Sequence, residues 1–467
     1  MTFISFSFVI LFSVALLARL TIGRRKTEPT YLGLILFLSV IFYSWEVPAY
    51  LLVLLASVLM DYVSGLLIAA QAVYERRRLY LIISLTLNLG LLFLFKYLDF
   101  ALASLGWLLG VPEQDVPRFN LILPLGISFY TFHSMSYVID VYRGYITRIK
   151  RFDDYLMFVI FFPQLVAGPI ATARDFVYQI HRVRRLHWVT FWHGVYLMIS
   201  GFFLKMVVAD NLAPAVDVHW PVAAGPNGDA AMAFCSAALF GGQIFADFAG
   251  YTNIARGAAY LLGFRLIINF REPYISQSLQ EFWTRWHISL SRWLRNYLYI
   301  PLGGNRHGSW QTYRNLMLTM LLGGLWHGAA WTFVVWGLLH GVGLAVERAL
   351  GLNRPGRSRL VRLGYYLVVQ AYILVTWVFF RATSVGEALQ LLGNLAVFKT
   401  PWAGWGELII AMSFLLPIVL MHLRAALIQA GLSHPAGKYE KAFLCGIMLY
   451  AILTLRGQSD AFLYFQF

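Results

Sequence analysis

The chain has 467 residues, of which 59% are hydrophobic and only 13% are charged. A soluble domain carries about a quarter charged residues. This composition therefore excludes a soluble globular protein, because the chain could not cover its own surface with polar groups, whereas lipid can solvate the apolar excess. The net charge of +15 lies in separated clusters, which argues against a nucleic-acid-binding patch.

Apolar blocks long enough to cross a bilayer recur along the whole chain. A helix needs roughly 20 apolar residues to span the hydrocarbon core. The first block precedes its basic residues and has no small-residue cleavage site, so it is predicted to be a retained helix with its N-terminus outside. Residues 155–170 contain Pro163, Gly168 and Pro169 and are predicted to be broken or re-entrant. About 11 spans are predicted, beginning near Thr2, Tyr31, Ala49, Leu79, Asn120, Trp188, Ala231, Asn315, Gly364, Gly406 and Lys441.

The basic residues alternate with loops that have few or none. Residues 212–229 contain no Lys or Arg, whereas basic clusters occur at 24–26, 76–78, 143–151, 182–185, 285–295 and 354–362. This positive-inside pattern predicts that the basic loops face the cytoplasm and that loops 99–118 and 210–229 face outward. The basic cluster at 354–362 fits the positive-inside pattern only if the apolar run before it crosses the membrane twice or turns back within it. Cys235 and Cys445, the two cysteines, both lie in predicted spans, so neither a disulfide framework nor a thiolate metal site is expected.

No soluble domain, low-complexity tract or internal repeat interrupts the chain, which predicts one all-α membrane domain over residues 1–467. The longest polar stretch contains an amphipathic segment at 279–298, in which His287 lies at the edge of the apolar stripe. An interfacial helix with a lipid-seeking aromatic side is predicted, and a surface brace without chemistry is the alternative. At 100° per residue, one face carries Phe282, Trp283, Trp286, Leu290, Trp293, Leu294 and Tyr297, and the opposite face carries Glu281, Arg285, Arg292, Arg295 and Asn296.

Polar residues at membrane depth are the candidates for chemistry. His327 lies in the apolar segment GGLWHGAAW at 323–331, where Trp326 could form a pocket wall. A buried imidazole needs a polar neighbour or a water-filled cavity, and it could take a proton from a hydroxyl nucleophile. An interhelical hydrogen bond without a catalytic role is the alternative.

Other polar residues in the apolar blocks have weaker context. Asp247 could orient a catalytic histidine, pair with an arginine such as Arg256, or form a structural ion pair. His133 and His340 are expected to be structural. The sequence has no phosphate-binding loop, no nucleophile elbow and no zinc-binding His-Glu-x-x-His helix, so neither an acyl-enzyme nor a metal site is indicated.

An ordered set of motifs between residues 96 and 382 resembles the membrane-bound O-acyltransferase family. The resemblance is strongest to the bacterial branch that includes the alginate O-acetylation membrane protein. Small departures are Thr284, Asn253 and His133, where arginine, aspartate and glutamine are frequent. The motifs are LPLGISFY at 123–130, the segment 137–144, FFPQLVAGP at 161–169, FADFAGYTN at 245–253, LGFR at 262–265, the segment 281–306 ending YIPLGGNR, the segment 323–337, and WVFFRA at 377–382.

The resemblance implies more than the composition does. The near-invariant histidine of the family falls on His327 and a second functional histidine falls on His287. The implied fold is a ring of helices around a thinned centre, with a tunnel that joins the two membrane faces. An acyl donor enters from the cytoplasm, with acetyl-CoA expected in this branch. The acetyl group is often passed to a periplasmic partner.

These observations together predict an O-acetyltransferase of the bacterial cytoplasmic membrane. It would use acetyl-CoA and a polysaccharide or other envelope acceptor, and no bound cofactor. His327 would be the general base, and His287 would bind the donor or orient the reacting groups. The supporting residues would be Asp247, Trp326 and Asn296, and the donor phosphates would bind to Arg285, Arg292 and Arg295. The alternatives are D-alanyl transfer from a carrier protein to teichoic acid, an envelope-precursor transporter, and an inactive scaffold.

Overall fold

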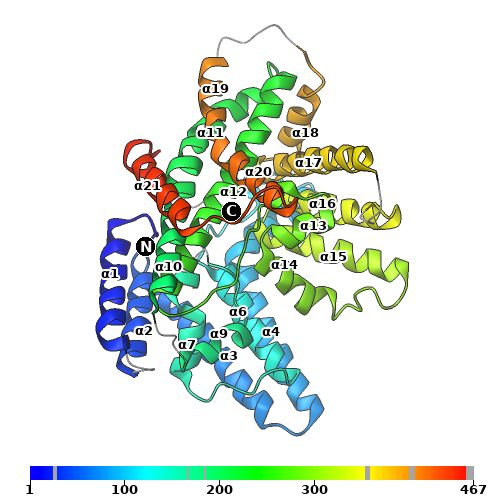
Figure 1. Cartoon of the computed structure of the whole chain (residues 1–467). Helices are drawn as coiled ribbons and strands as arrows, with labels where there is room; N and C mark the ends of the chain where they lie inside the picture. The colour runs from blue at the N-terminus through cyan, green and yellow to red at the C-terminus, as the bar shows by residue number, and fades with distance from the viewer. Residues whose placement is uncertain (25–28, 166–167, 183–185, 353–357, 399–404, 459–467) are drawn as a thin grey trace. The chain divides into compact units, whose positions relative to one another are not determined.

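The computed structural model describes residues 1–24, 29–165, 168–182, 186–352, 358–398 and 405–458, and every regular element within these ranges is helical (Figure 1). The predicted all-α class is therefore confirmed. Parts of three predicted basic clusters, at residues 25–26, 183–185 and 354–357, lie outside the described residues, as do positions 166–167 of the predicted re-entrant segment.

The chain divides into two compact units, and the single domain predicted over residues 1–467 stays a prediction. Unit 1 comprises Met1–Met198 and Thr252–Ile267, and unit 2 comprises Ile199–Tyr251 and Ile268–Phe467. Helix α12 (Ala230–Leu261) contributes to both units. All the residues predicted to form the functional site fall in unit 2.

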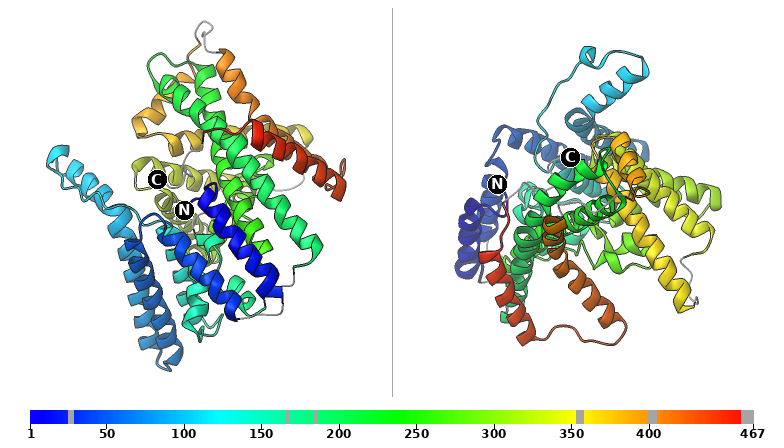
Figure 2. Two further views of the ribbon diagram at one scale, coloured as in Figure 1. Left: turned by 90° about the vertical axis from the view of Figure 1, so that its left-hand side faces the viewer. Right: turned by 90° about the horizontal axis from the view of Figure 1, so that it is seen from above.

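Unit 1 contains the N-terminal helices, of which α1 and α2 lie side by side in the views of Figures 1 and 2. Helices α3 and α4 are joined by a buried polar cluster, because Asp61 accepts hydrogen bonds from Ser84 Oγ at 2.6 Å and from Asn88 Nδ2 at 2.8 Å. Such interhelical hydrogen bonds hold apolar helices in register. The elements are α1 (Phe6–Thr21), η1 (Ile22–Arg24), α2 (Pro29–Ser44), α3 (Ala49–Ala70), α4 (Tyr74–Leu92), η2 (Phe93–Tyr97), α5 (Leu98–Leu108), η3 (Glu113–Asp115), α6 (Ile127–Tyr142), α7 (Phe152–Ile160), α8 (Phe162–Leu165), α9 (Ala173–Ile180) and most of α10 (Trp188–Phe202).

Unit 2 contains the remaining helices, and two of its elements, η4 and η6, are short π-helical turns, a form often found at functional sites. Besides part of α12, the elements are η4 (Phe203–Ala209), α11 (Asp210–Ala224), η5 (Pro273–Ile275), α13 (Leu279–Arg285), α14 (Ile288–Leu294), η6 (Arg295–Tyr299), α15 (Ser309–His327), α16 (Trp331–Ala349), α17 (Arg359–Arg381), α18 (Val385–Asn394), α19 (Trp405–Ser413), α20 (Leu416–Gln429) and α21 (Lys438–Thr454).

Several helices are long and apolar enough to cross a membrane. Two further helices, Gly406–Ser413 and Leu416–Gln429, are together long and apolar enough to cross a membrane, but the pair is bent by 43° at the break between them. The count of about 11 spans is not confirmed, because several predicted spans fall on helices that are shorter or more polar. Among the described residues the five that qualify are Ala49–Ala70, Tyr74–Leu108, Trp188–Ala224, Ala230–Leu261 and Leu360–Arg381.

The predicted single amphipathic helix over residues 279–298 is wrong in two respects. It is broken between α13 and α14, because His287 adopts a left-handed backbone conformation with φ 42° and ψ 54°, and α14 then continues directly into the π-helical turn η6. The backbone of Asn269 holds this break, since its carbonyl accepts from Ile288 N at 2.9 Å. The aromatic side also faces the protein interior rather than lipid: Trp286 is fully buried, with its ring 4.7 Å from that of Trp377.

Helices α15 and α16 form a tightly packed hairpin that positions the end of α15. A Cβ atom on Gly324 would collide with the backbone oxygen of Phe333, and one on Gly337 would collide with that of Met320. Glycine at both positions therefore lets the two backbones touch. His327, the last residue of α15, is fixed in space by this contact.

Candidate functional site

His327 is enclosed by aromatic rings from three helices of unit 2. Its ring centroid lies 5.0 Å from that of Trp326, 5.1 Å from that of Trp336 on α16, and 5.3 Å from that of Phe380 on α17. Only 3% of the residue is exposed. The three aromatic neighbours restrict the ring's orientation and keep bulk water away from it.

His287 lies directly beside His327. Its ring centroid is 6.2 Å from that of His327 and 5.9 Å from that of Trp326, and the ring of Phe248 closes its other side at 4.7 Å. The structure thus brings together the two histidines that lie 40 positions apart in sequence, together with Trp326. His287, at the edge of the apolar stripe, is fully buried, so its side chain faces the protein interior.

The backbone of His287 is in the left-handed region, where a side chain costs roughly 1–2 kcal/mol. Glycine would avoid that cost, so the imidazole is retained in spite of strain, which favours a functional role. His287 also begins α14, where its Nδ1 accepts a hydrogen bond from Leu290 N at 3.4 Å. A neutral ring that accepts at Nδ1 carries its hydrogen on Nε2.

Burial lowers the pKa of the His287 imidazole to about 3, so the ring is neutral at physiological pH. An unfolded histidine has a pKa near 6.5, so between these values the unfolded chain binds a proton that the folded chain does not. Stability therefore falls as the pH falls below about 6.5. Asparagine tolerates a left-handed backbone, so the His287→Asn variant should fold. When the pH falls from 6.5 to 4.5, we expect the unfolding free energy of the wild type to decrease by roughly 2–3 kcal/mol more than that of this variant.

SDS-induced unfolding at the two pH values, followed by circular dichroism, measures this difference. The other buried histidines contribute equally to both proteins and cancel in the comparison. Equal pH dependence of the wild type and the His287→Asn variant would show that His287 is not held neutral by burial.

Asp247 belongs to a buried ion-pair cluster. Its carboxylate lies 2.9 Å from Lys205 Nζ, and Asp210 lies 2.6 Å from the same nitrogen. Arg256 is not the partner that its sequence position suggested, because its Nη1 donates instead to Asn253 Oδ1 at 3.4 Å. Lys205 was missed because it is a single basic residue in an apolar run, without a charge pattern around it.

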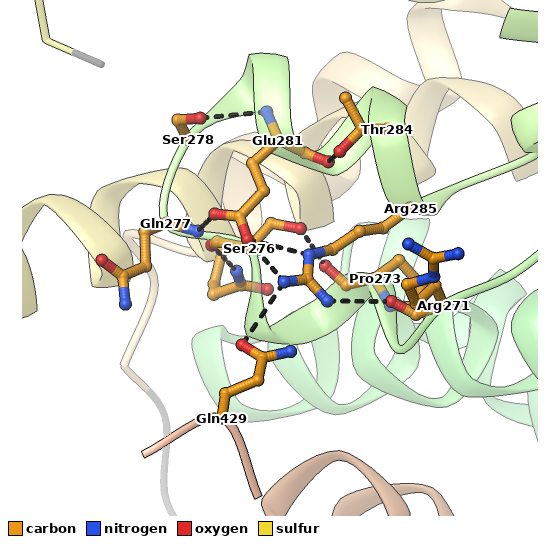
Figure 3. Close-up of polar contacts among 10 residues, drawn as sticks. Arg271, Pro273, Ser276, Gln277, Ser278, Glu281, Thr284, Arg285 and Gln429 are labelled. Atoms are coloured by element: carbon orange, nitrogen blue, oxygen red, sulfur yellow. Dashed lines mark hydrogen bonds and ion pairs between the residues drawn. The ribbon is translucent and has the colours of Figure 1, made fainter. Parts of the chain in front are cut away.

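Arg285, which is predicted to bind donor phosphates, has its guanidinium group hydrogen-bonded within the protein. Its Nε donates to Glu281 Oε1 at 2.8 Å, its Nη1 to the Arg271 carbonyl at 3.1 Å, and its Nη2 lies 3.4 Å from Gln429 Oε1 (Figure 3). These contacts fasten α13 to its surroundings. Arg292 is exposed on α14, and its predicted role in binding donor phosphates stays a prediction.

Arg295 lines a cavity of about 640 Å³ between α13, α14, α15, α16 and the loop after η6. Arg306 and Arg348, for which no role was predicted from the sequence, line the same cavity. Arg306 ends the YIPLGGNR motif, so a signal was present, whereas Arg348 reads as an ordinary basic residue near a helix C-terminus. Asn296 follows Arg295 in η6 and is half-buried, and its predicted supporting role stays a prediction.

Among the residues that the structure describes, no three His, Cys, Asp or Glu side chains come together in an arrangement that could hold a metal ion.

Comparison with known proteins gives this site a family. Residues 148–355 match the model of the membrane-bound O-acyltransferase family. The chain is 41% identical over 370 residues to the Pseudomonas aeruginosa protein named "Probable alginate O-acetylase AlgI". The aligned region covers 79% of this chain and 70% of that protein. It is 35% identical over 384 residues to the peptidoglycan O-acetyltransferase of Helicobacter pylori, covering 76% and 72% of the two chains.

A more distant relative is the teichoic acid D-alanyltransferase of Bacillus subtilis, with 27% identity over 356 residues and coverage of 72% and 86%. The chain belongs to the membrane-bound O-acyltransferase family. It is a multi-pass membrane enzyme, an O-acyltransferase of the AlgI-like bacterial branch, as the motifs predicted.

Proposed function

We propose that this enzyme transfers an acetyl group from acetyl-CoA to a hydroxyl group of an envelope polysaccharide, in the cytoplasmic membrane of a bacterium. The observation that carries the proposal is the pairing of His287 and His327, whose ring centroids are 6.2 Å apart in an aromatic enclosure. Two relatives that carry O-acetyl transfer in their names, the alginate and the peptidoglycan enzymes, support the acetyl group and the polymeric acceptor. The accepting hydroxyl lies either on the polysaccharide itself or on a periplasmic protein that passes the acetyl group on to the polysaccharide.

In the proposed reaction, His327 removes the proton from the acceptor hydroxyl while that oxygen attacks the thioester carbonyl. A carbon–oxygen bond forms, the carbon–sulfur bond breaks, and the departing thiolate takes the proton back from the imidazolium. The carbonyl end of α15, where His327 lies, stabilises the positive charge that develops on the ring. His287, with its hydrogen on Nε2, can donate to the developing oxyanion of the thioester.

A donor test checks this proposal. The purified protein in nanodiscs is given acetyl-CoA with and without a de-O-acetylated envelope polysaccharide; free CoA is followed with a thiol reagent and ester groups by NMR. We expect CoA release that depends on the acceptor and matches the esters formed. If CoA is released without new esters, even after the periplasmic partner is added, the polysaccharide is not the acceptor.

D-alanyl transfer is the second candidate, and the teichoic acid relative is the observation that favours it. The same nanodiscs receive a D-alanyl thioester on a carrier protein in place of acetyl-CoA. If the enzyme consumes this thioester but not acetyl-CoA, the transferred group is D-alanyl rather than acetyl, and the reaction is still an O-acyl transfer. Family membership favours either transfer over the transporter and scaffold hypotheses, and neither of those consumes a thioester.

A further inference from the structure

A second cavity, of about 150 Å³, lies in unit 1, and the proposed reaction does not involve it. Helix α2 lies against α7, and α7 lies against α9, so the cavity is bounded by three elements (Figure 1). The residues that α2 contributes are all apolar and include Leu32 and Leu36, and Met157 of α7 adds a third large apolar side chain. The polar lining comes from the start of α7 and the end of α9. The cavity therefore joins a hydrocarbon-like wall to a polar one.

Each of the three elements meets the cavity beside a basic cluster that is predicted to face the cytoplasm. Pro29 closely follows the first basic cluster of the chain, Arg151 ends the cluster at 143–151, and His181 directly precedes the cluster at 182–185. Positively charged loops lie at the cytoplasmic surface of a membrane protein, next to the lipid headgroups of the inner leaflet. The cavity is therefore expected at the depth of those headgroups.

Two carboxylates are held at the polar wall by ion pairs. Asp154 lies 2.8 Å from His181 Nε2, and its side chain is only 11% exposed. Asp153 accepts a hydrogen bond from Arg151 Nε at 3.0 Å, and both of these side chains are far more exposed. Among the described lining residues the cavity thus has two carboxylates but one guanidinium group. Its own charge is more acidic than that of the basic clusters around it.

This set of groups fits a zwitterion that carries a hydrocarbon chain. A carboxylate accepts hydrogen bonds from the N–H groups of a primary ammonium, whereas a quaternary ammonium has no N–H to donate. A guanidinium group pairs well with phosphate oxygens. The apolar wall formed by α2 suits hydrocarbon. A phosphate, a primary ammonium and an acyl chain occur together in a phospholipid with an ethanolamine headgroup.

We infer that this cavity binds one phosphatidylethanolamine molecule of the inner leaflet. Arg151 binds the phosphate, and Asp153 and Asp154 bind the ammonium group. The start of an acyl chain lies along Leu32 and Leu36, so the lipid ties α2 to α7 and α9. The basic clusters alone would favour an anionic lipid such as phosphatidylglycerol. A preference for ethanolamine therefore reports on the two carboxylates, and it does not depend on the proposed function.

Native mass spectrometry of the full-length protein, stripped of lipid in detergent, tests the inference. The protein is titrated with dioleoyl lipids that carry ethanolamine, choline or glycerol headgroups, and the Kd of the first bound lipid is measured. We expect the Kd for the ethanolamine lipid to be about fivefold lower than for either of the others, the size of effect that one net hydrogen bond supplies.

Two variants separate the parts of the headgroup. Asp154→Asn should remove the preference for ethanolamine over choline, because it takes away the charge that faces the ammonium group. Arg151→Gln should weaken all three lipids, because all three carry the phosphate. Glu113→Gln is the matched control, since Glu113 belongs to an exposed ion pair with Arg118 in the same unit and does not line the cavity. It should leave the three Kd values unchanged.

Soluble glycerophosphoethanolamine distinguishes a bilayer lipid from a soluble compound with the same polar groups. It lacks the acyl chains, so it should not displace the lipid at equal concentration. If it does, the apolar wall plays no part and the assignment to a lipid is wrong.

The lipid preferences decide the rest. If the wild type binds the choline or the glycerol lipid as tightly as the ethanolamine lipid, the inference is wrong. It is also wrong if a folded Asp154→Asn protein keeps the wild-type preference. If Asp154→Asn does not fold, Asp153→Asn decides alone, because that side chain is 48% exposed and the change is easily tolerated. This variant should lose at least half of the preference, and an unchanged preference would overturn the inference.

Discussion

Replacing His327 with glutamine is expected to lower kcat for acyl transfer by about 10²- to 10⁴-fold while changing the KM for the donor only a few-fold. General-base catalysis by a positioned histidine contributes a factor of this size. Glutamine preserves much of the volume inside the ring formed by Trp326, Trp336 and Phe380, so the α15–α16 hairpin should remain folded. Thiol release at saturating donor, alongside the elution profile in detergent, measures both effects.

His133→Gln is the control for the loss of a buried histidine. His133 lies in unit 1 and its Nε2 accepts a hydrogen bond from Ala171 N at 3.2 Å, which a glutamine oxygen can also accept. This variant should retain activity within about threefold. A His327→Gln enzyme that also keeps its kcat within threefold would rule out His327 as the base.

Much of the architecture could be predicted because it depends on composition and on the length of apolar blocks. Helices within a bilayer satisfy their own backbone hydrogen bonds, so long apolar blocks leave few alternatives to an all-α fold. That His287 and His327 belong to one functional site could be predicted only from the family motifs. Nothing in the spacing of 40 residues indicates a ring separation of 6.2 Å, which depends on how α14 and α15 pack.

The errors have physical causes in particular residues. The periodic pattern over 279–298 continues through the break, because a histidine rather than a glycine or proline occupies the left-handed position at 287. The aromatic side of this segment was assigned to lipid because the lipid phase and a protein core are equally apolar in sequence. Trp286 and Phe282 are in fact fully buried in unit 2. The partner of Asp247 is 42 positions away at Lys205, a distance at which charge patterns carry no information.

Lys205→Met is expected to lower the free energy of unfolding by about 3–5 kcal/mol. The ammonium group lies between Asp210 at 2.6 Å and Asp247 at 2.9 Å, and all three side chains are at most 4% exposed. Removing one member of a buried ion pair leaves a charge that the low-dielectric interior does not stabilise. Here the two carboxylates lose a shared partner at once. SDS-induced unfolding in mixed micelles, followed by circular dichroism, measures the change.

The exposed ion pair between Arg381 and Asp217 supplies the control. Its atoms are 2.7 Å apart, but the Asp217 side chain is 62% exposed, so Asp217→Asn should change stability by no more than about 1 kcal/mol. A loss below about 1 kcal/mol for Lys205→Met would mean that the buried cluster is solvated or dispensable.

Asp247→Asn then separates the two hypotheses for Asp247. This variant keeps the Lys205–Asp210 pair, so a purely structural role implies a smaller loss of stability than Lys205→Met and an unchanged kcat in the folded protein. A role in tuning the site implies the reverse, a fall in kcat of tenfold or more with most of the stability retained. The route for such an effect is short, because the next residue on α12, Phe248, packs against the ring of His287. Stability and kcat measured on the same preparation therefore assign Asp247 to the fold or to the reaction.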